Sequence, residues 1–413
     1  MVDFDKYQLN NGLTVILHYD STTPMAVVNT LYDVGARDEK EQKTGFAHLF
    51  EHLMFGGSIN IEDFDTQLQK AGGESNAFTS NDLTNYYNIV PAQNIETALW
   101  LESDRMLSLA FTKKSLEVQR DVVIEEFKQR YLNQPYGDVW LHLRPLVYEK
   151  HPYKWATIGK DISHIENATM EDVKSFFKTF YTPSNAILCI SGNFNKELIR
   201  LQIDNYFKDI PQKPKPKRLN IIEPKQKEYK SKNIYRDVPA GAFYYAFKMG
   251  SRTSADYYLG DLMSDAIGKD NASLLNIKLK KELNLVSEIN AFITGSIDCG
   301  LFIISGKLSE GVDFDTLEDA LWNALEGIKE EGVGNQKLKA LKNKIRTAKA
   351  FQEQGLLSRS MNLAFFELLG DAKKINTEEG KYENIKDSNL QIFAKTIFVK
   401  TNCSLLKVHQ NAR

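Results

Sequence analysis

Alternating apolar and polar residues mark several short segments of the chain, and this period of two predicts β-strands. In the first half we expect strands at residues 14–18, 26–33, 75–80 and 84–91, a helix that begins near residue 46, and several long helices after the last strand. In the second half we expect strands at residues 242–249, 285–294 and 299–308, with helices between and after them. Hairpin-linked strands with helices segregated between them indicate an α+β fold, in which each sheet is mostly antiparallel and helices pack on one of its faces.

The two halves of the chain are separated by a segment rich in proline and lysine, and they share a similar ending. Prolines at this density favour extended backbone, so residues 211–232 are predicted to form a semi-rigid, exposed linker, with a basic recognition tail as the alternative. Each half ends in a helix, a related motif ("FKTFYTPSN" at 177–185 and "AKTIFVKTN" at 394–402) and an apolar strand. We therefore predict a duplicated fold, with related domains at residues 1–210 and 233–413.

The segment "GFAHLFEHLMFGG", residues 45–57, places three polar side chains in an otherwise apolar helix. We expect Thr44 to cap its start and the final glycine pair to terminate it. At about 100° per residue, His52 lies about 40° from His48 on the helical wheel, and Glu51 lies about 60° away on the other side. The three groups therefore share one narrow face. Burying a carboxylate beside imidazoles is costly without a partner, which is either a divalent metal ion or a hydrogen-bonded polar cluster.

The spacing of these residues suits a zinc site that activates water. Two histidines at positions i and i+4 can direct their rings at one ion, and the glutamate on the same side can hold a water without binding the metal. The order H-x-x-E-H is the inverse of the thermolysin-type motif. Zinc lowers the pKa of its water towards neutrality, and a carboxylate takes a proton as the water attacks a peptide carbonyl. The motif predicts one Zn²⁺ per chain, bound by His48 and His52, with Glu51 as general base.

Two histidines leave a zinc ion short of a third protein ligand. The best candidate segment is "SLEVQRDVVIEEFKQRY", residues 115–131, which is strongly helical and contains the adjacent pair Glu125 and Glu126. Neighbouring valines and a phenylalanine indicate that this part of the helix is partly buried. The pattern itself does not choose between the two glutamates, and two exposed side chains without a metal are the alternative.

Composition excludes several other classes of function. The 413-residue chain is 42% hydrophobic and 26% charged, as expected of a globular protein with two domains. Its net charge of −2 gives no electrostatic reason to bind nucleic acid or a membrane surface, and its apolar runs are shorter than the roughly 20 residues that span a membrane. The N-terminal residues lack the positive region of a signal peptide, so we expect a cytoplasmic protein if the sequence is full length, or a periplasmic one if a signal peptide was removed. The three cysteines are far apart and predict buried, reduced thiols.

The sequence resembles the inverzincin metallopeptidases of the pitrilysin, insulin-degrading enzyme and mitochondrial processing peptidase family, and most closely the short bacterial members. The motifs that carry the resemblance are "NGLTVILHYD", "GARDE", "GFAHLFEHLMFGGS", "AGGESNAFTSNDLTNYY", "VQRDVVIEEF" and "PSNAILCISGNF". They cover the first half densely, and the second half is similar only in outline. The resemblance implies two related α+β domains that form half of a clamshell, of which only the first is catalytic and binds zinc.

Carried over by position, the resemblance implies that Glu126 is the third zinc ligand beside His48 and His52, and that Glu51 is the general base. The family usually has another glutamate seven residues before the metal glutamate. This chain has Gln119 there, which should weaken the polarisation of the site without removing a ligand.

The resemblance also implies where substrate binds. Residues Asn76, Ala77, Phe78 and Thr79 match the edge strand with which such enzymes pair an extended substrate backbone. Strand addition recognises main chain more than side chains, which suits a peptidase of broad specificity. We therefore expect a zinc-dependent endopeptidase that cuts peptides or unfolded segments.

The second half lacks features that family members use for catalysis. Self-sufficient members and non-metal partner subunits carry an arginine and a tyrosine there, in a pattern like S-R-L…L-A-Y. In this chain Leu274 stands at the arginine position and Ser287 at the tyrosine position. The offset between the halves puts Asp265, Gly268 and Lys269 at the metal positions. We hypothesise that the chain is the zinc-bearing subunit of a heterodimer whose homologous partner supplies the arginine and tyrosine, with a homodimer as the other assembly.

Two other functional interpretations are weaker. An inactive scaffold subunit, similar to the family's relatives in the respiratory cytochrome bc complex, would be marked by loss of metal residues, whereas all four positions are filled here. A purely structural zinc site would favour cysteines and four protein ligands, and neither is seen in the sequence.

Overall fold

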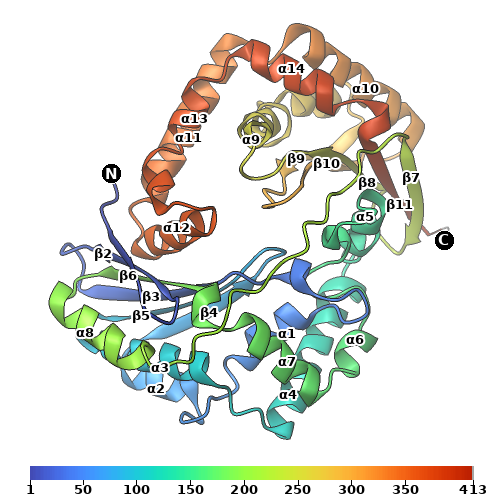
Figure 1. Ribbon diagram of the computed structural model, residues 1–413. Coiled ribbons are helices and arrows are strands. Elements are labelled where there is room, and N and C mark those ends of the chain that lie inside the picture. Colours follow the sequence, from blue (N-terminus) through green and yellow to red (C-terminus); the bar gives the residue numbers. More distant parts are fainter. Residues whose placement is uncertain (412–413) are drawn as a thin grey trace. The chain divides into compact units, whose positions relative to one another are not determined.

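The computed structural model describes residues 1–411, which group into two compact units. Unit 1 comprises Met1–Phe127, Trp155–Asn220 and Lys349–Thr377, and unit 2 comprises Lys128–Lys154, Ile221–Ala348 and the residues from Glu378 onwards. Each unit is built around one β-sheet with helices packed against it (Figure 1). The predicted α+β fold is therefore confirmed.

The sheet of unit 1 has six strands in the order β1-β2-β6-β3-β5-β4. Their bounds are β1 (Asp5–Gln8), β2 (Thr14–Tyr19), β3 (Met25–Tyr32), β4 (Glu74–Thr79), β5 (Thr84–Pro91) and β6 (Ala186–Gly192). Strands β2 and β6 are parallel, and every other neighbouring pair is antiparallel. The sheet is therefore mixed but mostly antiparallel.

The sheet of unit 2 has five strands in the order β7-β11-β8-β10-β9. Their bounds are β7 (Lys230–Arg236), β8 (Ala242–Met249), β9 (Val286–Ile293), β10 (Gly300–Leu308) and β11 (Cys403–Gln410). Strands β7 and β11 are parallel and the remaining pairs are antiparallel. The five strands of unit 2 have the same order as strands β2 to β6 of unit 1, and the parallel pair β7 and β11 corresponds to the parallel pair β2 and β6. The topology therefore supports the predicted duplication. Unit 1 has one additional strand, β1, which has no counterpart among the described residues of unit 2.

Helices lie between groups of strands along the chain. Those of unit 1 are α1 (Phe46–Leu53), α2 (Phe64–Lys70), α3 (Ile95–Leu107), α4 (Lys113–Phe127), α6 (Ser163–Glu166), α7 (Met170–Phe180), α8 (Lys196–Phe207) and α12 (Leu356–Leu368). Those of unit 2 are α5 (Val139–Val147), α9 (Ala255–Gly268), α10 (Phe314–Glu331), α13 (Gly380–Glu383) and α14 (Asp387–Ile397). Helix α11 (Asn335–Gln352) begins in unit 2 and ends in unit 1. Two π-helical segments, η3 (Lys128–Leu132) and η6 (Asn276–Glu282), belong to unit 2.

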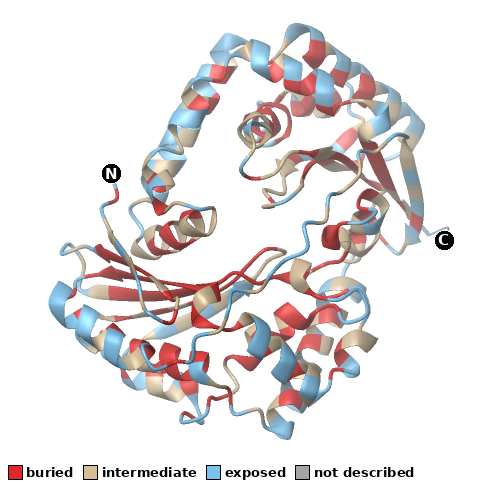
Figure 2. Cartoon of the chain, in the orientation of Figure 1, coloured by how far each residue is buried: buried red, intermediate tan, exposed pale blue. Residues whose placement is uncertain are grey.

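Helices cover both faces of the first sheet, whereas the sequence predicted helices on one face. Helix α12 packs through Leu363 and Ala364 on a face that includes Ile16, Leu31 and Cys189. Strands β3 and β6 are buried at almost every position, as expected of strands with helices on both sides. Figure 2 shows this continuous burial along the strands and the exposed outer sides of the helices.

The second sheet repeats this arrangement with a helix from the other half of the chain. Helix α5 packs through Val139 and Leu143 against Ala246, Ile303 and Leu406. The chain halves and the compact units therefore do not coincide, because α5 and α12 each pack with the sheet of the other half. The predicted division at residues 211–232 stays a prediction about the organisation of the sequence.

The proline- and lysine-rich linker is extended up to the start of β7, and polar contacts hold it to both units. The Arg218 guanidinium pairs with the carboxylates of Asp33 and Asp38 in unit 1, at 2.6 Å from Nε to the Asp38 oxygen. The Glu223 carboxylate accepts hydrogen bonds from the backbone N–H groups of residues 149, 150 and 151 in unit 2, at 2.8–3.0 Å. Within residues 1–411, no helix is long and apolar enough to cross a membrane.

Candidate metal centre

The predicted polar face of the histidine helix is present in the structure. In α1, the residues Phe46, Ala47, Leu49, Phe50 and Leu53 are buried, whereas the three polar side chains, His48, Glu51 and His52, are half-buried. The helix therefore packs on every side except the one that carries the motif.

The start of α1 differs from the prediction, because Gly45 and not Thr44 occupies the N-cap position. Gly45 has a φ of 88°, a left-handed conformation that favours glycine, and a Cβ there would lie 2.7 Å from the Ile158 carbonyl oxygen. Since glycine has no capping side chain, the buried Glu39 takes this role. Its carboxylate accepts from the N–H of Gly45 at 2.9 Å and of Ala47 at 2.8 Å. Burial raises the pKa of Glu39 well above its ordinary value, although the two amide donors favour the ionised form.

A buried layer of aromatic and ionic side chains contacts the other end of α1. The Tyr86 hydroxyl donates to the Phe50 carbonyl at 3.5 Å, and burial keeps its pKa well above the ordinary value, so it remains a donor. Arg105 lies 4.6 Å from the Tyr86 ring and pairs with the fully buried Glu102. The motif helix is thus fixed at both ends by groups that are themselves held in the core.

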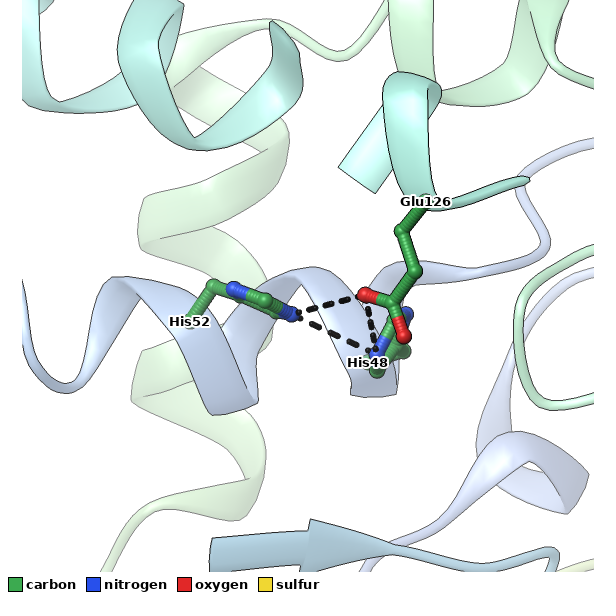
Figure 3. Close-up of side chains that lie close together, drawn as sticks. All are labelled: His48, His52 and Glu126. Carbon is green, nitrogen blue, oxygen red and sulfur yellow. Dashed lines mark hydrogen bonds and ion pairs between the residues drawn. The ribbon is translucent and has the colours of Figure 1, made fainter. Parts of the chain in front are cut away.

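Helix α4 brings a glutamate to the polar face of α1. Glu125 is exposed, whereas Glu126 is half-buried and points at the two histidines (Figure 3). One oxygen of Glu126, Oε2, lies 3.5 Å from Nε2 of His48 and 3.4 Å from Nε2 of His52. The two Nε2 atoms are 3.4 Å apart. Among residues 1–411 this is the one group of His, Cys, Asp or Glu side chains found with metal-binding geometry.

These distances fit a zinc ion. Ligands about 2.0–2.1 Å from a tetrahedral zinc are separated from one another by about 3.3–3.4 Å, which matches the three distances between the donor atoms. The donor set of two imidazoles and one carboxylate also fits zinc, and three protein ligands leave a fourth position for water or substrate, as in catalytic sites. The three residues could therefore hold a metal ion, and the identification of each as a ligand stays a prediction.

Glu51 and Gln119 lie on the same two helices. Glu51 precedes His52 and is three residues from His48, so it projects from the same side of α1. Gln119 is half-buried and lies about two turns before Glu126, so it projects from the same side of α4. Their roles as general base and as a weaker polarising group stay predictions.

The segment predicted to pair with substrate is the outer strand of the first sheet. Residues Asn76, Ala77, Phe78 and Thr79 belong to β4, which pairs with β5 and ends the sheet on that side. The strand also contacts α1, with the Thr79 hydroxyl 3.5 Å from the Ala47 carbonyl. An open strand edge therefore lies next to the helix that carries the candidate metal centre.

The remaining histidines have hydrogen-bond partners. Each ring lies within 2.7–3.2 Å of a partner atom, and the pairs are His18 with the Asp3 carbonyl, His142 with Asp138, His151 with Asp298, His164 with Thr44, and His409 with Asn233. The three cysteines form no disulfide; Cys189 and Cys403 are buried as predicted, whereas Cys299 is only half-buried. In the second half, Asp265 and Lys269 form an ion pair at 2.7 Å where the offset placed metal positions.

Sequence reasoning missed the groups that hold the site in place. Glu39 belongs to the quoted motif "GARDE" but no role was predicted for it, because its amide partners lie at the start of a helix whose N-cap, Gly45, comes six residues later. Arg105 and Glu102 lie in α3, where charged residues are ordinarily read as exposed.

Fold and site together resemble those of one class of protein, the metallopeptidases that carry the inverse motif H-x-x-E-H on a helix. The chain belongs to the insulinase family, peptidase family M16. The family model described as insulinase (peptidase family M16) matches residues 14–154, and the model described as peptidase M16 inactive domain matches residues 167–345.

Relatives within this family include bacterial and mitochondrial proteins. The zinc protease PqqE of Helicobacter pylori is 29% identical over 341 residues, which is 81% of this chain and 76% of the relative. A probable mitochondrial-processing peptidase subunit beta of Arabidopsis thaliana is 27% identical over 71% of this chain and 57% of its own length. The crystal structure of a protease from Helicobacter pylori has a TM-score of 0.93 and 24% identity, and it covers 99% of this chain and all of that one, which shows a shared fold.

Proposed function

We propose that this chain is a zinc-dependent endopeptidase that hydrolyses peptides or unfolded polypeptide segments. The observation that carries the proposal is the convergence of Nε2 of His48, Nε2 of His52 and Oε2 of Glu126 within 3.5 Å of one another. This arrangement leaves one coordination position open and sets a carboxylate, Glu51, on the same face of α1. The zinc proteases among its relatives support the same conclusion.

Each residue then has a defined part in hydrolysis. When bound, zinc supplies Lewis-acid activation of water and of the substrate carbonyl. His48, His52 and Glu126 hold the ion, and Glu51 accepts the proton of the attacking water and passes it to the leaving amine. Strand β4 holds the substrate as an added strand through its backbone, so that the cleaved bond is fixed by main-chain contacts. The glutamine at position 119 leaves the site less strongly polarised than a glutamate would.

We further propose that the chain works as the catalytic subunit of a heterodimer. Leu274 and Ser287 cannot donate hydrogen bonds to a developing oxyanion in the way an arginine and a tyrosine can. A homologous subunit that lacks H-x-x-E-H and carries both residues would supply them. The relative named subunit beta of mitochondrial-processing peptidase is consistent with a subunit role. High zinc-dependent turnover by the purified chain alone, without such a partner, would refute this part of the proposal.

The variant Glu51→Gln tests the catalytic proposal. We expect it to retain one zinc per chain, measured by atomic emission, and to lose about 10²–10⁴-fold in hydrolysis of an internally quenched, unfolded peptide in the presence of the partner. The matched control is Glu125→Gln, which changes an exposed glutamate of the facing helix and should retain activity. Equal activity of wild type and Glu51→Gln would contradict the mechanism and favour an inactive scaffold.

A further inference from the structure

The two sheets differ at one edge, and this difference points to a binding surface on unit 2. Strand β7 occupies the place in its sheet that β2 occupies in the first sheet, since each is parallel to the strand that ends its half of the fold. In unit 1 an additional antiparallel strand, β1, covers the outer edge of β2. In unit 2, among the described residues, β7 is the last strand of the sheet, and Figure 1 shows it at the outer edge. A place for one more extended strand therefore exists beside β7.

A recess of about 870 Å³ adjoins this edge, on the side of the sheet where α10 begins. Its floor is aromatic: the rings of Tyr235 and His409 stack with their centroids 4.9 Å apart, and Phe314 lies 4.6 Å from His409. Tyr235 is 59% exposed although it belongs to a strand. Such an exposed ring beside an open strand edge offers a flat apolar surface to a neighbouring chain.

The accessible charge of the recess is negative. Glu310, Asp313 and Asp315 line it and are exposed, and Asp315 has 94% of its side chain accessible. The one lysine of the lining, Lys407, is only 13% accessible and is already paired with Asp315 and Glu318. Burial lowers the pKa of His409, so its ring adds no positive charge at neutral pH. The recess therefore favours a cationic side chain, which can also lie against the aromatic faces.

We propose that β7 and this recess form an accessory binding site for an extended, basic segment of the substrate polypeptide. The segment pairs with the outer edge of β7 as β1 pairs with β2, and it places a lysine or arginine over Tyr235 within reach of Glu310 and Asp315. Backbone pairing supplies affinity for any unfolded segment, and the acidic, aromatic recess selects basic ones. That the bound segment is a substrate rests on the peptidase function proposed above, whereas the existence of a binding site for a basic segment does not depend on it.

Binding is tested with fluorescent ten-residue peptides on the full chain carrying Glu51→Gln, which should not cut them. A peptide with alternating lysine and arginine residues should bind at least tenfold more tightly, at low salt, than the same peptide with glutamates in their place. Two further peptides carry N-methyl groups on either the odd or the even residues. Because alternate N–H groups of a strand point to opposite edges, one methylated set should lose at least tenfold in affinity relative to the other. Equal affinities of the two sets would overturn strand addition.

Protein variants then place the binding at β7 and not at β4. We expect Tyr235→Ala to weaken binding of the basic peptide at least fivefold, and the double change Glu310→Lys with Asp315→Lys to weaken it at least tenfold at low salt. The matched control is Glu330→Lys with Glu331→Lys, the same charge change at the far end of α10, where both residues are exposed. Wild-type affinity in the first two variants would overturn the proposal.

Two further measurements distinguish this proposal from self-association of the chain at the same edge and from the proposed peptidase activity. Sedimentation that shows self-association lost on Tyr235→Ala, with no peptide binding, would assign the edge to a second copy of the chain and overturn the proposal. Absence of hydrolysis by the wild-type chain with its partner would refute the peptidase but leave the peptide affinities unchanged. Conversely, loss of the accessory site would leave the hydrolysis of short uncharged peptides intact.

Discussion

His48 and His52 come from α1 and Glu126 comes from α4. The contribution of α4 to zinc affinity can therefore be measured by changing Glu126 alone. We expect Glu126→Gln to weaken zinc binding by at least about 10²-fold, because a neutral amide oxygen replaces a charged ligand that closes the three-residue set. A chelator competition measures the dissociation constant directly. The fold should be retained, since Glu126 is half-buried and not part of the core.

The neighbouring residue provides the matched control for this measurement. Glu125→Gln makes the same chemical change one position earlier on α4, at an exposed site. We expect its zinc affinity to stay within about twofold of wild type. If both variants weakened zinc binding equally, the effect would reflect the charge of the helix and the identification of Glu126 as ligand would fail.

Glu39 should affect the site through the helix it caps. Both of its carboxylate oxygens accept backbone N–H groups of α1, and glutamine can offer only one acceptor in that position. We expect Glu39→Gln to lower the free energy of unfolding by about 1–3 kcal/mol, because a buried donor loses its partner. Calorimetry measures this loss, and zinc affinity should fall with it as the first turn of α1 moves.

The control for Glu39 lies two residues further along the same loop. Glu41 pairs with Lys160 at 3.4 Å on the surface, where such pairs contribute little. Glu41→Gln should therefore change stability by less than about 0.5 kcal/mol. Equal effects of the two substitutions would show that the loop responds to charge and not to the loss of the cap.

At this scale, the sequence predicted the polar face of α1 correctly, because that face depends only on helical periodicity. The helical pattern left the choice between Glu125 and Glu126 open, since two adjacent residues differ only in which side of α4 they occupy, and only the family resemblance implied Glu126. The sequence placed the cap at Thr44 because threonine is a good capping residue, but the left-handed backbone at Gly45 moved the cap by one position. Periodicity is local information, whereas the choice of ligand and cap depends on packing between helices.

At the scale of elements, helices were expected in this part of the chain, but local patterns did not predict that α12 packs on the first sheet. Its residue Leu363 is fully buried and packs on the face of the first sheet that the other helices leave open. We expect Leu363→Ala to lower the free energy of unfolding by about 2–4 kcal/mol, because it leaves a cavity that the neighbouring strands cannot fill. Calorimetry should record a melting temperature lower by about 4 °C or more.

Ile392→Ala is the control for this substitution. It removes an aliphatic side chain from another helix, α14, where 64% of the residue is exposed. We expect a change within about 0.5 kcal/mol. A comparable loss in both variants would mean that α12 contributes no more than a surface helix.

The positions of the strands were predicted well, but the helices that pack on each face of the sheet were not. The predicted strand at residues 26–33 matches β3 (Met25–Tyr32), and that at 84–91 matches β5 (Thr84–Pro91). The short strand β1 was missed because four residues give too little alternation to detect. The continuous apolar run "AILCIS" in β6 was a sign of burial on both faces, but nothing in that run identifies the helix that covers it.

At the scale of the whole molecule, the comparison of the two repeats shows why, within residues 1–411, only the first half holds a candidate metal centre. The five shared strands have the same order and the same parallel pair in both units. In the second half an ion pair, Asp265 with Lys269, occupies the helix turn that the repeat relates to the two histidines. The linker between the halves was predicted from composition. The exchange of α5 and α12 between the two halves of the chain could not be predicted, because it depends on contacts between residues far apart in sequence.

The same duplication offers a test of why the chain should need a partner. Leu274 packs at the margin of the unit 2 core just before η6, and Ser287 is exposed on β9, so both positions tolerate longer side chains. If the missing arginine and tyrosine limit catalysis, then Leu274→Arg with Ser287→Tyr should raise zinc-dependent peptide hydrolysis without the partner at least tenfold, because a second copy of the variant would supply the two donors in the partner's place. A single oxyanion donor is worth about 10²–10³ in rate. The control is Leu274→Met with Ser287→Phe, which matches the bulk without the donors and should show no gain. Addition of Glu51→Gln should abolish the gain. A folded, zinc-loaded variant without increased hydrolysis would mean that the partner contributes something other than these two side chains.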